Sequence, residues 1–134
     1  MTRIYKIGMA VIRNKKLLLC EPYAFKDLIT LGGVKEGDES ATENLLREVE
    51  EELGSKAILQ TETLKYLGNF EDFAAGKTER IVEIEFYIGK LKGRLKASSE
   101  IKKLHWVGKD DDLSQLSAVV KNKIFPFLIN EGYL

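Results

Sequence analysis

The sequence predicts one α/β (α+β) domain, spanning residues 1–134, in which helices pack against a largely antiparallel or mixed sheet. The chain has 134 residues, of which 44% are hydrophobic and 31% charged, so it can bury one core but not a second of similar size. Strand-like and helix-like segments follow one another in the order β-β-β-α-β-β-β-α, which is typical of an α+β architecture. No repeat, low-complexity tract or linker interrupts this order.

The first part of the chain is predicted to hold a β-hairpin and a glycine-rich loop. Residues 4–12 form the first strand, and the turn Asn14-Lys15-Lys16 leads to its hairpin partner at residues 17–20. Pro22 ends that partner, because proline has no N–H to donate to a strand ladder. A short apolar stretch then runs into a loop with three glycines within residues 32–37.

A central helix is predicted over residues 41–53. Ser40, followed three residues later by Glu43, is typical of a capping box, and Gly54 is a natural C-terminal stop. The apolar residues that follow one stripe of this helix, and must therefore face the core, are Ala41, Leu45, Val49 and Leu53, with Leu46 beside them.

The rest of the chain is predicted to be mainly β-structure followed by a helix. Strands are expected at residues 57–69 (as two pieces), 81–91 and 104–107. Residues 74–77 indicate a turn, and the alternation of apolar and polar side chains over 81–91 indicates a strand with one polar face. From Ser114 onward the chain is mostly helix, with Pro126 as a kink or a stop.

Composition and charge argue against nucleic acid and membrane partners. Lys plus Arg number 21 and Asp plus Glu number 21, so the usual electrostatic argument for a nucleic-acid partner is absent. The single cysteine, Cys20, lies in an apolar run and is expected to be buried in a protein of a reducing compartment. The N-terminus lacks signal-peptide organisation, and no run approaches the ~18 apolar residues of a membrane span. The protein is therefore predicted to be cytoplasmic.

Three glutamates on the central helix suggest a metal site. Glu48, Glu51 and Glu52 are spaced i, i+3 and i+4, so they fall within an arc of about 100° beside the apolar stripe. Like charges placed so closely repel one another, which suggests a compensating cation. Arg47 can pair with one carboxylate, but three convergent carboxylates suit a hard divalent ion such as Mg²⁺. The alternative is a solvated acidic helix face, and spacing alone leaves both interpretations open.

The segment from Gly33 to Gly54 resembles the Nudix box. That pattern, which residues 33–55 follow, is Gly, five residues, Glu, seven residues, Arg-Glu, an aliphatic residue, any residue, Glu-Glu, any residue, Gly and an aliphatic residue. The fixed positions that match are Gly33, Glu39, Arg47, Glu48, Glu51, Glu52 and Gly54, with Val49 at the first aliphatic position. Ser55 replaces the closing aliphatic residue, which is a packing position. The chain is therefore identified as a member of the Nudix (MutT-like) hydrolase family.

The resemblance implies an α/β/α sandwich with a mixed central sheet and a pyrophosphohydrolase acting on phosphoanhydride bonds. Family members hydrolyse nucleoside diphosphates linked to another moiety, with Mg²⁺ and in some cases Mn²⁺ as the cofactor. Transferred position by position, the metal ligands would be Glu48, Glu51 and Glu52, with the Gly33 carbonyl as a further ligand. Glu39 would support the site or hold a metal through water, and Arg47 would orient a carboxylate through a bidentate ion pair. A homodimer also agrees with the family.

The sequence leaves open which carboxylate accepts the proton of the attacking water. Some family members use a box glutamate, here Glu51 or Glu52, and others use a glutamate on a loop outside the box. Glu100 resembles that loop glutamate of MutT-like members, as a base or an additional metal ligand; the alternative is an ordinary surface acid. Other acids that compete for this role are Glu79, Glu83 and Glu85.

The substrate is expected to be a small nucleotide. The aromatic residues that could stack on a base or sugar are Tyr23, Phe25, Phe70, Phe73, Tyr87 and Trp106, and the basic ones that could contact phosphate are Arg3, Arg13, Lys26 and Arg80. Markers of dinucleoside polyphosphate or ADP-sugar members are not evident at Phe70-Glu71-Asp72-Phe73, which favours a nucleoside triphosphate pyrophosphohydrolase. The alternatives are an ADP-ribose or other nucleotide-sugar hydrolase, a dinucleoside polyphosphate hydrolase, and a non-catalytic nucleotide-binding domain.

Overall fold

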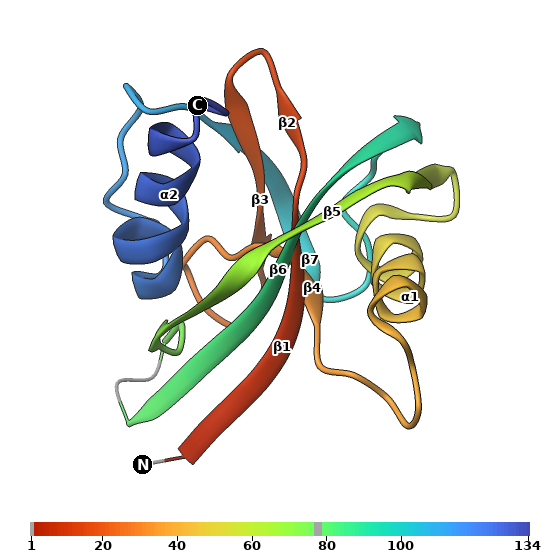
Figure 1. Ribbon diagram of the computed structural model, residues 1–134, viewed down its shortest axis with the longest axis horizontal. Coiled ribbons are helices and arrows are strands. Elements are labelled where there is room, and N and C mark those ends of the chain that lie inside the picture. Colours follow the sequence, from red (N-terminus) through yellow and green to blue (C-terminus); the bar gives the residue numbers. More distant parts are fainter. Residues whose placement is uncertain (1, 77–78) are drawn as a thin grey trace.

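Two helical segments lie on opposite sides of the strands in the computed structural model, which describes residues 2–76 and 79–134 (Figure 1). The elements before the central helix are β1 (Thr2–Ala10), β2 (Ile12–Arg13), β3 (Lys16–Pro22) and β4 (Leu31–Gly33). The central helix α1 (Ala41–Leu53) is followed by β5 (Ala57–Phe73), β6 (Arg80–Gly93), β7 (Ile101–Val107), a π-helical turn (Val120–Ile124) and α2 (Phe125–Asn130). No helix within the described ranges is both long and apolar enough to cross a membrane.

The strands form two sheets, and the chain passes from the larger sheet to the smaller one between the end of β1 and the start of β2. The larger sheet has the order β4-β1-β6-β5, in which β1 pairs parallel with β6 while β4 and β5 pair antiparallel with their neighbours. The smaller sheet, β2-β3-β7, is antiparallel throughout. The predicted α+β fold with a mixed sheet is therefore confirmed, and the split into two sheets is an addition to it.

The core consists of two apolar clusters, one on the side of each helix. Alternation along β1 sends Ile7 and Met9 toward α1, where they meet Leu45 and Val49. On the other side, Phe86 of β6 packs in the same cluster as residues of the π-helical turn and α2. The apolar stripe predicted for α1 is thus confirmed, with the exception of Leu46, whose side chain is 44% exposed. Cys20 is fully buried, as predicted.

The prediction of one first strand over residues 4–12 is wrong, because β1 ends at Ala10 in the larger sheet and the hairpin partner of β3 is the separate strand β2. The hairpin between β2 and β3 turns at Asn14 and Lys15, which adopt φ values of 53° and 61°. The prediction of two strand pieces over residues 57–69 is wrong, because β5 is one long strand whose pairing with β6 shifts register twice. Gly76 lies in a turn as expected, whereas Lys77 of the predicted turn lies outside the described residues.

The C-terminal helix begins later than predicted and continues through its proline. Helical structure starts near residue 118, because residues 114–117 form a turn and an extended segment in which Leu116 bridges Leu28. Pro126 does not end the helix, which runs to Asn130. Proline lacks an N–H and its ring crowds the preceding turn, and the wider π-helical turn before it provides the room.

Candidate active site

The central helix begins and ends where its local signals place it, and this positions the acidic residues. The Ser40 hydroxyl accepts a hydrogen bond from the Glu43 N–H at 3.1 Å, and the Ser40 N–H donates to the Glu43 carboxylate at 2.9 Å. These two bonds form the predicted capping box. The helix ends at Gly54, whose φ of 87° favours glycine.

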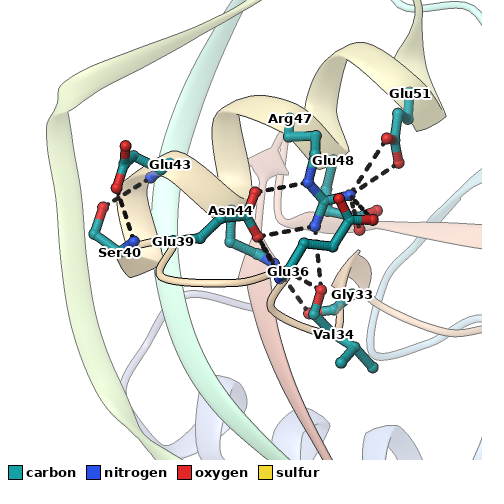
Figure 2. Close-up of polar contacts among 10 residues, drawn as sticks. All are labelled: Gly33, Val34, Glu36, Glu39, Ser40, Glu43, Asn44, Arg47, Glu48 and Glu51. Carbon is teal, nitrogen blue, oxygen red and sulfur yellow. Dashed lines mark hydrogen bonds and ion pairs between the residues drawn. The ribbon is translucent and has the colours of Figure 1, made fainter.

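Arg47 is the centre of an ion-pair network between α1 and the preceding loop (Figure 2). Its Nε and Nη2 donate to the two oxygens of Glu39 at 2.7 and 3.0 Å, which is a bidentate pair. It also donates to Glu48 at 3.0 Å and to Glu51 at 3.2 Å. The Arg47 guanidinium, assisted by the Glu36 N–H, lowers the pKa of Glu39 to about 2. Arg47 therefore fixes the position of three carboxylates at once.

Asn44 joins the loop to the helix from the buried side. Its side chain is 0% exposed, and its Nδ2 donates to the Val34 carbonyl at 3.1 Å and to Glu39 at 3.3 Å. The sequence prediction missed this residue. The available signal was a polar side chain at a position where the apolar stripe of the helix requires burial.

Glu48 and Glu52 differ from Glu39 because desolvation by burial outweighs the positive charge near them. Glu48 is 8% exposed, and burial raises its pKa despite the opposing effect of Arg47. Glu52 accepts one hydrogen bond, from the Gly32 N–H at 2.9 Å, and burial raises its pKa to about 8. Two partly desolvated carboxylates on one helix face are poorly stabilised as anions, and an added cation would stabilise both.

Gly33 allows the loop to approach Glu48 closely. A Cβ atom on Gly33 would lie 2.4 Å from Oε1 of Glu48, closer than any real contact. Any side chain here would displace the Glu48 carboxylate.

An acidic cleft of about 920 Å³ lies in front of α1. Its acidic lining residues are Glu36, Glu48, Glu51, Glu52 and Glu100, and its basic ones are Lys6, Lys35 and Arg47. Glu100 comes from the segment before β7, where its carbonyl accepts a hydrogen bond from the Tyr23 N–H at 3.0 Å. The structure thus brings Glu100 into the same cleft as the helix glutamates, while Glu39 lies outside the lining, behind Arg47.

An apolar pocket of about 490 Å³ adjoins this cleft. The residues that line both are Lys6, Ala24, Phe25, Ile29 and Gly32. Its floor is formed by β1 and β6 through Ile4, Val82 and Ile84, and Thr30 and Arg80 add polar groups to its wall. The cleft and the pocket together offer an acidic compartment beside an apolar one.

Several of the other candidate residues contact other side chains of the protein. Phe70 packs edge-on against Phe86 and Phe127, and the Arg13 guanidinium lies 5.4 Å from the Trp106 ring centre. Arg3 pairs with Glu71 and Glu83. Among the competing acids, Glu85 accepts a hydrogen bond from the Tyr87 hydroxyl, and Glu79 does not line the cleft. The aromatic candidates that do line the cleft are Tyr23 and Phe25.

The box glutamates do not form a preformed metal cage. Across residues 2–76 and 79–134, no three His, Cys, Asp or Glu side chains gather closely enough to hold an ion as they stand. The reason is visible in the contacts: Glu51 turns toward Arg47, while Glu52 turns toward the Gly32 N–H. The donor set still suits a hard cation, because it consists of carboxylates with oxygens to spare and a nearby glycine carbonyl.

The sequence of the chain matches the NUDIX domain family over residues 3–126. The chain belongs to the Nudix family. A comparison with curated protein sequences finds no significant match. The predicted family membership is confirmed, and with it the assignment as a Nudix hydrolase, a class of enzyme.

Several solved structures share this fold. The solution structure of the E. coli ORF135 protein is 25% identical with a TM-score of 0.71, and the match covers 98% of this chain and 93% of that one. The MutT protein from Methanosarcina mazei Go1 is 21% identical with a TM-score of 0.75, covering 98% and 96%. A bifunctional NMN adenylyltransferase/ADP ribose pyrophosphatase from Francisella tularensis, complexed with AMP and a Mn ion, is 17% identical with a TM-score of 0.68, covering 96% and 42%.

Proposed function

We propose that this Nudix hydrolase cleaves a phosphoanhydride bond in a nucleoside diphosphate-linked compound, and that its substrate is a nucleoside triphosphate. The observation that carries the proposal is the continuity of the acidic cleft with the apolar pocket through Phe25, Ile29 and Gly32. A nucleoside triphosphate has the matching division, with a flat aromatic base at one end and, at the other, a polyanionic chain that a divalent cation would bridge to the acidic side chains. The pocket volume of about 490 Å³ is within the usual range for sites of small ligands.

The proposed metal ligands are Glu48, Glu51 and Glu52, with the Gly33 carbonyl in addition. A divalent ion, Mg²⁺ or Mn²⁺, would neutralise phosphate charge and lower the pKa of the attacking water when bound. The fit rests on the donor set: Glu48 is 8% exposed with Arg47 on one oxygen, and Glu52 accepts a single hydrogen bond from the Gly32 N–H, so both keep a carboxylate oxygen for a cation. Arg47 holds Glu51 and Glu48 in place from the protein side.

Glu100 is proposed as the general base. In the reaction, a water oxygen attacks phosphorus and the phosphoanhydride P–O bond breaks, leaving its electron pair on the departing phosphate oxygen. The proton of the water passes to a carboxylate. What supports this role is that Glu100 lines the same cleft as the glutamates of α1 and is exposed, with no ion-pair partner within the described residues. The box carboxylates Glu51 and Glu52 are the alternatives for the same role.

The test measures the hydrolysis products that the purified protein forms in the presence of Mg²⁺ or Mn²⁺. The substrate panel holds nucleoside triphosphates, ADP-ribose, other nucleotide sugars and dinucleoside polyphosphates. Glu52→Gln removes an anionic ligand at nearly constant volume and should lower turnover by ~100-fold or more, since even residues that only support a metal ligand cost 10- to 100-fold. The matched control is Glu50→Gln, an exposed residue of the same helix that does not line the cleft.

A third cavity gives the runner-up substrate class a structural basis. This groove of about 250 Å³ adjoins the acidic cleft at Val34 and Lys35 and is lined by Tyr5, Asn69 and Glu85. It could take a second moiety beyond the phosphates, as in a nucleotide sugar or dinucleoside polyphosphate. Turnover of those compounds in preference to triphosphates would select this class. Binding of a nucleotide without turnover, unchanged in Glu52→Gln, would instead identify a non-catalytic domain.

A further inference from the structure

We propose that the Lys6 ammonium binds the phosphate nearest the nucleoside and so presents the next phosphoanhydride bond to the carboxylates of α1. This inference rests on the proposed function, because it assumes a nucleotide that spans the apolar pocket and the acidic cleft. Lys6 would be a residue that sets the position of the substrate, and it was not among the basic residues singled out in the sequence.

Lys6 lies where three cavities meet. It lines the acidic cleft, the apolar pocket and the smaller groove, and it alone does so among the described residues. The backbone explains this position. β4 pairs with β1 only from Ile7 to Met9, so residues 2–6 leave one edge of β1 open, and Lys6 lies where that open edge meets β4. Alternation along β1 points the Lys6 side chain away from the face of Ile7, toward the apolar pocket, and at the open edge it also borders the acidic cleft.

The charge of Lys6 is not used by the protein itself. Within residues 2–76 and 79–134, its ammonium makes no ion pair within 4.0 Å and no hydrogen bond to a side chain. It is nevertheless partly buried and near enough to Glu52 to oppose the rise in the pKa of that carboxyl. A half-buried cation with no carboxylate in contact is suited to an anion that arrives with the substrate.

The other cations near the site cannot serve both compartments. Arg47 is committed to carboxylates, and it does not line the apolar pocket. Arg80 lines the apolar pocket but not the acidic cleft, and Lys35 lines the cleft but not the pocket. A base in the apolar pocket therefore places its first phosphate beside Lys6, and the outer phosphates extend toward Glu48 and Glu52.

The decisive measurement is binding to a series of ligands that differ only in phosphate number. The affinities of a nucleoside and of its mono-, di- and triphosphate are measured by calorimetry in metal-free buffer, where no turnover occurs. Lys6→Met should weaken all three phosphorylated ligands by the same factor, about tenfold, which is the usual cost of one charge-assisted hydrogen bond. Binding of the nucleoside should not change, and Lys6→Arg should restore most of the lost affinity.

The control variant is Lys26→Met. Lys26 was predicted as a phosphate contact, but it is exposed on the loop that carries Phe25 and lines none of the three cavities. The substitution therefore removes a nearby positive charge that does not reach the proposed phosphate position. It should leave all four affinities unchanged. Thermal melting of each variant shows that the fold is intact.

Three outcomes would overturn the inference. A loss of affinity confined to the triphosphate would assign Lys6 to the terminal phosphate. An equal loss of affinity for the nucleoside would show that Lys6 contacts the base or sugar and not a phosphate. No loss at all would remove Lys6 from the site. Each of these leaves turnover of triphosphates by the wild type standing. If the wild type neither binds nor hydrolyses any nucleotide, the proposed function fails and the inference fails with it.

Discussion

Glu39 and Glu52 belong to one sequence motif and stand in opposite electrostatic environments. Glu39 receives two hydrogen bonds from Arg47, at 2.7 and 3.0 Å, and its pKa is lowered to about 2. Glu52 receives one backbone hydrogen bond and is otherwise desolvated, so its pKa is raised to about 8. Acids of the first kind hold the loop against the helix. Acids of the second kind lower the stability of the ligand-free protein and are the ones that gain from a cation.

The largest effect is expected on the pH dependence of stability. In metal-free buffer, the unfolded chain ionises Glu52 near its ordinary pKa, while the folded chain keeps it protonated up to about pH 8. Folding therefore takes up a proton between those values, and the free energy of unfolding should fall by up to about 1.4 kcal/mol per pH unit as pH rises through this window. Glu48, whose pKa is also raised, acts in the same direction.

Denaturant unfolding of the wild type and Glu52→Gln between pH 5 and 9 checks this. The glutamine variant has no proton to lose, so its stability should be flatter with pH and exceed that of the wild type at the alkaline end. Glu39 does not contribute to the slope there, because its stabilisation is complete above its unfolded pKa and is lost only as pH falls toward 2. Parallel pH profiles for the two proteins would contradict the buried state of Glu52.

An intermediate effect is expected when the Glu39 side of the comparison is broken. Arg47→Lys keeps the charge but cannot form the two parallel hydrogen bonds to Glu39. It also removes the donor to the Val34 carbonyl, which is 3.1 Å away, so the loop loses its attachment to α1. The melting temperature should fall by about 5 °C, as for the loss of 1 kcal/mol or so in a domain of this size.

The same measurement on Glu50→Gln provides the baseline, since this exposed glutamate has no part in the network. A lysine variant that melts within a degree of the wild type would show that charge alone, and not the bidentate geometry, secures the loop.

Sequence alone predicted the parts of the site that depend on neighbours in the chain. The bounds of α1, its capping box and the stop at Gly54 follow from residues within one or two helical turns, and all are confirmed. The β2–β3 hairpin is predictable for the same reason, because its turn residues decide it locally. The Nudix box is a local pattern as well, and the family it indicates is confirmed.

Features that depend on distant residues could not be predicted in this way. The burial of Asn44 and the exposure of Leu46 depend on where the loop and β5 pack against α1. The position of Lys6 depends on where the pairing of β4 with β1 stops, which involves residues more than twenty positions apart. The start of the C-terminal helix near residue 118 depends on the bridge from Leu116 to Leu28. Periodicity within one segment carries no information on such contacts.

The smallest effect on stability, and the sharpest separation of stability from activity, is expected at Gly33, with Gly37 of the same loop as the comparison. Gly33→Ala places a Cβ against the Glu48 carboxylate, which can rotate away at little cost to the fold but then leaves its proposed ligand position. Turnover should fall while the melting temperature changes little. Gly37→Ala should do the reverse, because its φ of 56° costs an alanine about 1 kcal/mol while nothing lies within 4 Å of the new methyl group. If Gly33→Ala kept full turnover, the Glu48 carboxylate would not need its observed position, and Glu48 would belong with Glu39 among the acids that only hold the loop.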